Sequence, residues 1–368
     1  MRLDIEVVIY AYLFICLALL FFDLGYIFCS KHRGLHLKRR SLDWESEVQT
    51  QMKRLTEGLP PAPAHTRMIE TRLVRIGSLS SFGAALDRLG RKDGELTARY
   101  MYACQGSLQV VASHYMKRDS MERAYLSYLI SRHRPCYGEE YRPLMDILLE
   151  FLDGSTVYCR ENTLKALYAL WNCQAVENAL QLLNDRQVFH HTKLLSDGLL
   201  TFSGDREKLA SRLWRHRKEW SEELMLAVIQ FITGFTGQYR EVFLPVLQAK
   251  DTGMEIRLAL LRYYRRHPYE PVRPLLLSNL TGNEAEENIQ IVSAAVLARY
   301  PGTDTVRTLN ESLHHPNWYV RYNAAQSLVE LKTPPEELEE ILKGEDQYAR
   351  EILTYMLEDA DEGGDGHG

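Results

Sequence analysis

Histidine is the side chain most often used as a metal ligand or general base, and here it occurs in two doublets and one spaced pair. The doublets are His190–His191 and His314–His315, and the pair is His32 and His36. None has cysteine or carboxylate neighbours at metal-ligand spacing. The chain also has no P-loop and no GxGxxG, GxSxG or HExxH motif. We therefore assign no catalytic residue, no metal site and no cofactor, and we expect the protein not to be an enzyme.

Basic side chains are the second group with binding chemistry, because they can meet phosphates or lipid head groups. One cluster lies in residues 31–40, and another lies in 206–218, where Leu209, Leu213 and Trp220 form an apolar stripe. A solvated basic helix face explains the second cluster as well as a lipid surface does, and the same holds for the basic and aromatic segment 262–268. The candidate residues for a lipid or anionic surface are Lys31, Arg33, Lys38, Arg39, Arg40, Lys208, Arg212 and Arg215.

An apolar run from Val7 to Phe28 precedes the first basic cluster. As a helix it would reach about 33 Å, which is enough to cross a bilayer core. Its length and acidic start favour an uncleaved anchor over a signal peptide. One basic residue precedes the run and five follow it, so the charge bias places the C-terminal body in the cytoplasm. We expect a single-pass cell-membrane protein with its N-terminus outside, in which Asp23 lies at the interface or pairs with a partner helix.

Composition supports a folded helical body in a reducing compartment. The formal net charge is −5, with basic residues after the apolar run and acidic residues near the C-terminus. The acidic balance of residues 41–368 argues against a nucleic-acid partner. The six cysteines form no CxxC pair, which predicts reduced thiols rather than a disulfide framework.

An internal repeat of about 32 residues organises the chain from residue 155 onward. The segment that starts at Cys159 aligns without gaps with the segment that starts at Val320, and frames at His191, Leu224, Ile256 and Ile289 fall between them. The position of Leu328 is apolar or aromatic in every frame. It is filled by Leu167, Leu199, Ile232, Tyr264 and Leu297. Such a column predicts stacked helix pairs, since one pair cannot bury its apolar face alone.

The segment LHHPNWYVRYNAAQSLVEL, residues 313–331, resembles a HEAT repeat, and the short period resembles the repeats of phycobilisome lyase proteins. The resemblance implies an all-α, right-handed α-solenoid of helix pairs, preceded here by one transmembrane helix. It also implies that an Arg near the start of the second helix bonds an acidic or amide side chain in the nearby loop. The matching residues are Arg160, Arg257 and Arg321, with Asp153, Asp251 and Asn317 as partners.

One column of the second helices is polar, and we expect it to face solvent on the inner surface of the solenoid. It contains Lys165, Asp197, Gln230, Arg262 and Gln326, and Ala295 is its one apolar member. A solvated face explains this column, but solenoids bind partners through concave surfaces of this kind. We therefore name Lys165, Gln230, Arg262 and Gln326 as candidate protein-binding residues.

Breakers and composition divide the chain into five segments. Ser41 could cap a helix that Gly58 ends, and the pattern around Ser120–His133 predicts another helix. The Pro-rich stretch 59–65 predicts a semi-rigid spacer and the clearest domain boundary. The expected segments are a transmembrane anchor at 1–30, a basic juxtamembrane segment with a short helix and linker at 31–65, an irregular helical cap with the first repeats at 66–154, the repeat solenoid at 155–356, and an acidic disordered tail at 357–368.

Two further function classes stand beside the preferred one. We favour a membrane-anchored cytoplasmic scaffold that binds a protein, such as a membrane enzyme of envelope or exopolysaccharide synthesis. The first alternative is a lipid-surface-binding adaptor that uses the basic residues. The second is an enzyme on a HEAT scaffold, such as a lyase, for which no catalytic constellation is found.

Overall fold

The computed structural model describes residues 5–138, 140, 142–282 and 285–364. Within α1 and α20 it leaves the side chains of residues 5–9, 11, 26–33, 35, 36 and 361–364 undescribed. In the described ranges the chain forms twenty α-helices and one 3₁₀ helix, with no strand. It divides into two compact units. Unit 1 contains residues 1–183 and 201–206, and unit 2 contains residues 184–200 and 207–368.

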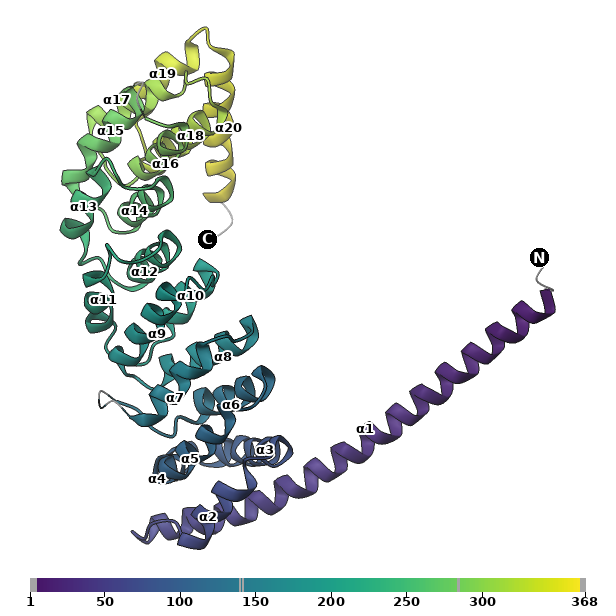
Figure 1. The fold of residues 1–368 in the computed structure, drawn as a ribbon. Helices are drawn as coiled ribbons and strands as arrows, with labels where there is room; N and C mark the ends of the chain where they lie inside the picture. Colours follow the sequence, from purple (N-terminus) through teal and green to yellow (C-terminus); the bar gives the residue numbers. More distant parts are fainter. Residues whose placement is uncertain (1–4, 139, 141, 283–284, 365–368) are drawn as a thin grey trace. The chain divides into compact units, whose positions relative to one another are not determined.

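Unit 1 begins with a long helix and continues as shorter helices that pack in pairs (Figure 1). The predicted helix at Ser120–His133 is confirmed with the same bounds. The helices of this unit are α1 (Ile5–Thr56), α2 (Pro63–Arg72), α3 (Ile76–Lys92), α4 (Gly94–Ala103), α5 (Gln105–Tyr115), α6 (Ser120–His133), α7 (Pro143–Leu152), α8 (Val157–Ala169) and most of α9 (Cys173–Asp185).

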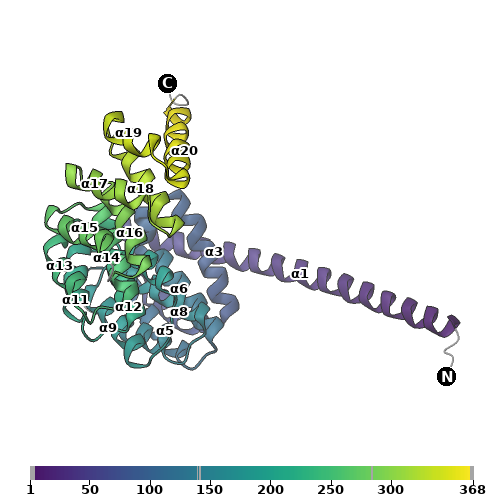
Figure 2. The ribbon, with the colours of Figure 1, turned by 90° about the horizontal axis from the view of Figure 1, so that it is seen from above.

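Helix α1 joins the predicted anchor at 1–30 and the predicted short helix within 31–65 into one continuous element. Ser41, predicted to cap a new helix, instead lies inside α1 and donates a hydrogen bond to the carbonyl of Lys38 at 2.8 Å. The C-terminal part of α1 buries Trp44, Val48 and Met52 against unit 1, and Gly58, at φ +78°, follows its end. The N-terminal part extends away from α2 and α3 (Figures 1 and 2).

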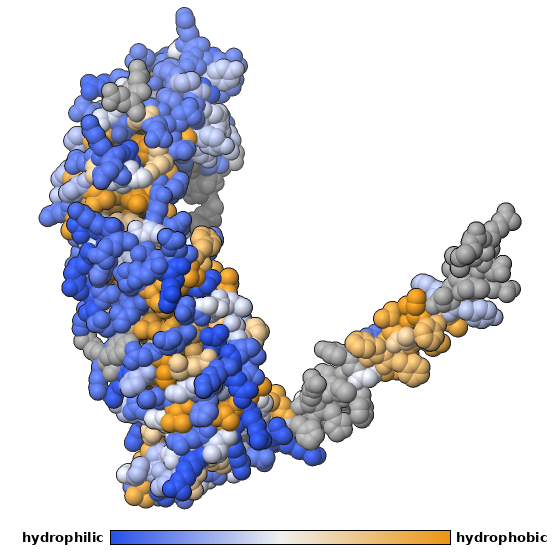
Figure 3. Space-filling model, in the orientation of Figure 1, coloured by the Kyte–Doolittle hydropathy of each residue, from blue (hydrophilic) through white to orange (hydrophobic). Residues whose placement is uncertain are grey.

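The membrane prediction needs correction. Among the described residues, no helix combines the length and the hydropathy that a membrane crossing requires. Part of the predicted span, residues 7–9, 11 and 26–28, has side chains outside the described set. Figure 3 shows apolar side chains on the described part of this stretch of α1. Phe14, Phe21 and Phe22 are exposed there. The predictions of a transmembrane helix at 1–30 and of a single-pass membrane location are therefore not supported.

The Pro-rich stretch is held against α1 in unit 1. The Ala62 amide donates to Gln51 Oε1 at 2.9 Å, and Arg54 Nε donates to the carbonyl of Pro60 at 3.3 Å. Pro63 occupies the first turn of α2, where its missing N–H costs nothing. His65, assigned to the linker from the sequence, is buried and bonds Glu47 at 3.0 Å and Tyr100 at 2.7 Å.

Unit 2 consists of helix pairs in two layers, and Figure 1 shows α13, α15 and α17 along one side and α12, α14, α16 and α18 along the other. Residues 357–364 of the predicted disordered tail instead extend the last helix, and residues 365–368 lie outside the described set. The helices are α10 (Thr192–Leu200), α11 (Arg206–Arg215, which starts at the unit boundary), α12 (Glu222–Phe235), α13 (Arg240–Gln248), α14 (Met254–Arg266), η1 (Glu270–Val272), α15 (Arg273–Thr281), α16 (Glu287–Leu297), α17 (Thr303–Ser312), α18 (Trp318–Glu330), α19 (Pro335–Lys343) and α20 (Gln347–Gly364).

The predicted repeat frame is confirmed by burial. The six residues of the Leu328 column are all 0% exposed: Leu167, Leu199, Ile232, Tyr264, Leu297 and Leu328. Successive second helices pack side by side from α10 through α20. Each repeat of unit 2 therefore completes the core of its neighbour.

The repeat frame predicts a difference between two positions on α18. Leu328→Asp would bury an unpaired carboxylate and should lower the free energy of unfolding by about 3 kcal/mol or more. Gln326→Asp lies at a partly exposed position and should cost about 0.5 kcal/mol or less. Urea unfolding of both variants measures the difference, and equal losses would contradict the frame.

A buried histidine in unit 1 predicts acid sensitivity. Burial lowers the pKa of His133 to about 4, although Asp87 at 3.4 Å acts in the opposite direction. Between pH of about 6.5 and about 4, the unfolded chain takes up a proton that the folded chain does not. Stability should therefore fall as the pH falls, by on the order of 1 kcal/mol for each pH unit. Urea unfolding across this range should show a shallower pH dependence for His133→Gln, whereas His114→Gln, at an exposed site, serves as the control.

Candidate protein-binding face

The polar column is exposed as predicted, but its members lie in both units. Lys165 belongs to unit 1 and pairs with Glu161 at 3.0 Å. In unit 2, Arg262 is exposed, and exposed Gln230 accepts a hydrogen bond from Ser196 Oγ at 3.1 Å. Gln326 is half-buried and donates to Glu330 at 3.1 Å. These contacts leave the column facing solvent, and its binding role stays a prediction.

The repeated arginines bond to backbone carbonyls in the loop before each second helix. Arg160 donates to Ser155 at 3.4 Å, and Arg321 donates to His315 at 3.2 Å. Arg257 donates to two carbonyls, those of Ala249 at 3.3 Å and Lys250 at 3.1 Å. Among the described residues, no hydrogen bond joins Arg257 to Asp251 or Arg321 to Asn317, the side chains predicted as their partners. Every residue has a backbone carbonyl, so these contacts do not depend on which side chain stands in the loop.

A fourth arginine has the same role and was missed in the sequence. Arg350 follows the buried Ala349 on α20 and donates to the carbonyl of Gly344. The spacing between Arg321 and Arg350 is shorter than the repeat period, so the repeat frame does not include Arg350. The available signal was an apolar residue followed by Arg near the start of a helix, as at Cys159–Arg160, Ile256–Arg257 and Val320–Arg321.

Two short polar side chains cap the helices that carry the last two arginines. Asn317 Oδ1 accepts the Tyr319 amide at 2.8 Å, and its Nδ2 donates to Glu287 at 3.2 Å. Asp346 Oδ1 accepts the amides of Tyr348 and Ala349 at 3.0 and 3.1 Å. A hydrogen bond from His314, together with these amides, lowers the pKa of Asp346. The caps fix the first turns of α18 and α20, and with them the side chains those turns display.

An aromatic patch occupies these first turns. We use this name for Trp318, Tyr319, Tyr322 and Tyr348 together with Arg321. Trp318 is 49% exposed, Tyr319 is 60% exposed and Tyr348 is 67% exposed. The Trp318 ring lies 5.2 Å from that of Tyr319 and 5.0 Å from that of Tyr322, and the Arg321 guanidinium lies 5.3 Å from the Tyr348 ring centre. These contacts form a ring cluster around Trp318 on α18 and an Arg321–Tyr348 pair that joins α18 to α20.

The aromatic patch was not predicted from the sequence, because the repeat pattern on α18 marks only the buried face of that helix. Val320 and Ala324 take the core positions, which leaves Trp318 and Tyr319 exposed and Tyr322 half-buried. The aromatic run WYVRY itself was the available signal.

The structure describes all the predicted basic side chains on α11 but only some of those on α1. Lys208 and Arg215 are exposed and Arg212 is half-buried on α11, and the predicted stripe of Leu209, Leu213 and Trp220 is buried. Lys38, Arg39 and Arg40 are exposed on α1, whereas the side chains of Lys31 and Arg33 lie outside the described set.

The segment 262–268 combines two core tyrosines with basic side chains, of which Arg262 and Arg266 are exposed. Tyr263 and Tyr264 are fully buried. Tyr263 Oη accepts the amide of Tyr239 at 3.1 Å, and Tyr264 Oη donates to the carbonyl of Arg240 at 2.6 Å. Their hydroxyl groups hold the turn that precedes α13.

The histidine doublets have local structural roles. His314 bonds Asp346 at 2.7 Å, and His315 Nδ1 accepts the amide of Asn317 at 3.0 Å. His191 Nδ1 similarly accepts the amide of Lys193 at 3.2 Å. These contacts organise loops and helix starts.

Comparison with known protein families identifies HEAT repeats in residues 273–358, which include the aromatic patch. No curated protein matches the chain. The match and the all-α structure together support a helical repeat scaffold, whereas a closer likeness to phycobilisome lyase proteins is not shown.

The loop-binding role of the arginines can be tested at Arg257. Arg257→Gln removes two hydrogen bonds to carbonyls at a half-buried site and should lower the free energy of unfolding by about 1–2 kcal/mol. Arg262→Gln on the same helix is a matched control, because Arg262 is exposed, and it should change stability by about 0.5 kcal/mol or less. Equal stability of the two variants would show that the loop bonds contribute little.

Proposed function

We propose that the protein is a scaffold that binds a protein partner through the aromatic patch on α18 and α20. The observation that carries the proposal is the exposure of one tryptophan and two tyrosines beside a half-buried tyrosine and an arginine, on a HEAT-repeat surface. Tryptophan, tyrosine and arginine are the residue types enriched at the energetic centres of protein interfaces. Their broad, rigid side chains bury much area for little loss of conformational freedom.

The aromatic patch is prearranged for binding. The caps at Asn317 and Asp346 fix the backbone beneath it, and ring contacts within the patch restrict its side chains. A partner would therefore meet a surface that has already lost part of its conformational entropy, which lowers the cost of association.

Charge indicates the chemistry of the partner. Residues 273–358 carry seven Lys and Arg against fourteen Asp and Glu. A partner surface with basic side chains would complement this balance, and its cations could also lie over the exposed rings. We propose a partner that presents basic and apolar side chains. The described residues give no reason to prefer a membrane enzyme of envelope synthesis as the partner. The proposed partner class rests on the charge and the exposed aromatic side chains of the surface.

The polar column extends the proposed interface. Gln230 lies on α12, Arg262 on α14 and Gln326 on α18. All three helices belong to the second-helix layer that also carries the patch. Exposed polar side chains around a central aromatic group are typical of an interface rim. Lys165 belongs to the other unit and is not part of this proposed interface.

The test is a paired substitution in the full-length chain. Trp318→Ala with Tyr348→Ala should weaken binding of a protein that co-purifies with the wild-type chain by at least about tenfold, because it removes two central aromatic side chains. The thermal midpoint should stay close to that of the wild type, since both side chains are about half exposed or more. Added salt should weaken the wild-type complex, because part of the attraction is between opposite charges.

Tyr158→Ala is the matched control. Tyr158 is 56% exposed and precedes a buried residue and an arginine on α8, as Tyr319 does on α18. The control should bind like the wild type. If the patch variant also binds like the wild type while Tyr158→Ala does not, the interface lies elsewhere.

A further inference from the structure

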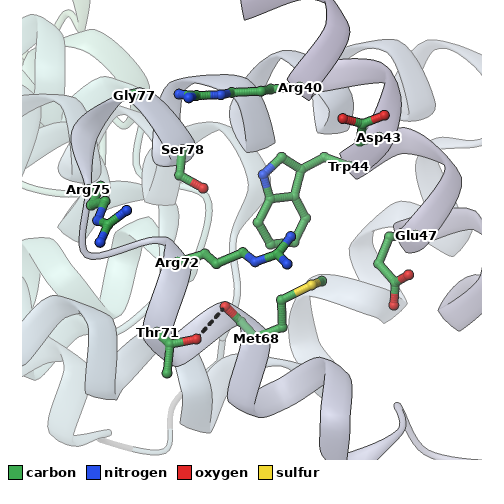
Figure 4. Close-up of a pocket in the computed structure, with 10 residues that line it drawn as sticks. All are labelled: Arg40, Asp43, Trp44, Glu47, Met68, Thr71, Arg72, Arg75, Gly77 and Ser78. Atoms are coloured by element: carbon green, nitrogen blue, oxygen red, sulfur yellow. Dashed lines mark hydrogen bonds between the residues drawn. The ribbon is translucent and has the colours of Figure 1, made fainter.

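An open pocket in unit 1 collects three arginines between α1, α2 and the start of α3 (Figure 4). Its volume is about 780 Å³, within the range of small-molecule sites. Arg40 reaches it from α1, Arg72 from the end of α2, and Arg75 from the turn before α3. The remaining lining residues are Asp43, Trp44, Glu47, Met68, Thr71, Gly77 and Ser78.

The three guanidinium groups have no ion pair among the described residues. This contrasts with Arg88 and Lys92 of α3, which both pair with Glu45, at 2.6 and 2.8 Å. Of the two carboxylates in the pocket, Glu47 already bonds His65 at 3.0 Å and Gln51 at 3.3 Å. Two carboxylates face three cations, so the pocket keeps an excess of positive charge.

Polar donors on the α3 side add to this field. Helix α3 is 17 residues long and begins at Ile76 without a side-chain cap. Its first amides and the positive end of its dipole therefore lie beside Gly77 and Ser78, which line the pocket. In Figure 4, Arg75 and Ser78 lie on one side of the space, and the carboxylates of Asp43 and Glu47 lie on the α1 side.

An apolar wall completes the pocket. The Trp44 indole is only 5% exposed and is held by an edge-on contact to Phe82 at 5.1 Å, and Met68 lies next to the pocket on α2. A ligand can therefore place an anionic group among the arginines and an apolar or aromatic body against this wall.

We propose that this pocket binds a small organic phosphate. A phosphate monoester carries about two negative charges and several acceptor oxygens, which suits arginine forks and an uncapped helix start together. The arginines Arg40, Arg72 and Arg75 hold the phosphate, and Trp44 and Met68 contact the organic body. This site is independent of the aromatic patch, which belongs to unit 2.

Calorimetric titration of the full-length chain with phenyl phosphate tests the proposal, with inorganic phosphate and phenol as comparison probes. Phenyl phosphate should bind saturably with one site, and more tightly than either comparison probe. Arg72→Gln with Arg75→Gln should weaken binding by at least about tenfold, and Arg40→Gln should weaken it in the same direction. Because the three side chains are exposed, unfolding midpoints should not change.

Arg67→Gln is the matched control, because Arg67 is an exposed arginine of α2 that does not line the pocket. Its affinity should stay within about twofold of the wild type. Absence of saturable binding up to about 10 mM phenyl phosphate would overturn the proposal, as would wild-type affinity in the Arg72/Arg75 variant. Tighter binding of inorganic phosphate would remove the role of the apolar wall. Tighter binding of a phosphoserine peptide through the same arginines would replace the small molecule with a phosphopeptide.

Discussion

The structure depends on burial between neighbouring helix pairs. No pair of this repeat can cover its own apolar face, so each second helix must place its core residue against the next helix. In unit 2 this requirement is met by Leu199, Ile232, Tyr264, Leu297 and Leu328, all of them fully buried. Dispersion and hydrophobic burial at these positions hold the layers together. The loops and the exposed positions are then free to vary.

Polar contacts keep the stacked helices in register. Arginines near the starts of the second helices bond loop carbonyls, and Asn317 and Asp346 cap the helices that follow them. These bonds leave fewer backbone groups unsatisfied at each helix start. They also determine which side chains the first turn exposes. The aromatic patch is thus a consequence of the same local geometry that holds the repeat.

The repeat was predictable from the sequence because burial imposes a period on it. The column through Leu328 and the helix at Ser120–His133 agree with the structure for this reason. The long helix α1 was not predicted as one element, because Ser41 and the basic residues before it resemble a helix start. The Pro-rich stretch reads as a spacer, yet Gln51 and Arg54 tie it back to α1.

The binding surfaces were harder to predict than the core, because exposed residues follow no period. The polar column was found since it interrupts an apolar pattern. The aromatic patch was not predicted, because its exposed members on α18, Trp318 and Tyr319, lie outside the apolar positions that the repeat conserves in type. The arginine pocket joins residues from three helices, and only Arg40 among its cations was predicted to meet an anion. Its convergence depends on the turn between α2 and α3.

The central claim is that the aromatic patch contacts a protein partner, and site-specific photo-crosslinking in cells tests it most directly. A photoreactive amino acid would replace Tyr319 in the patch or Tyr158 at the corresponding position of α8 in the other unit. The account predicts a discrete adduct with one partner protein from position 319 and none from position 158. An adduct from position 158 alone, or equal adducts from both positions, would contradict it.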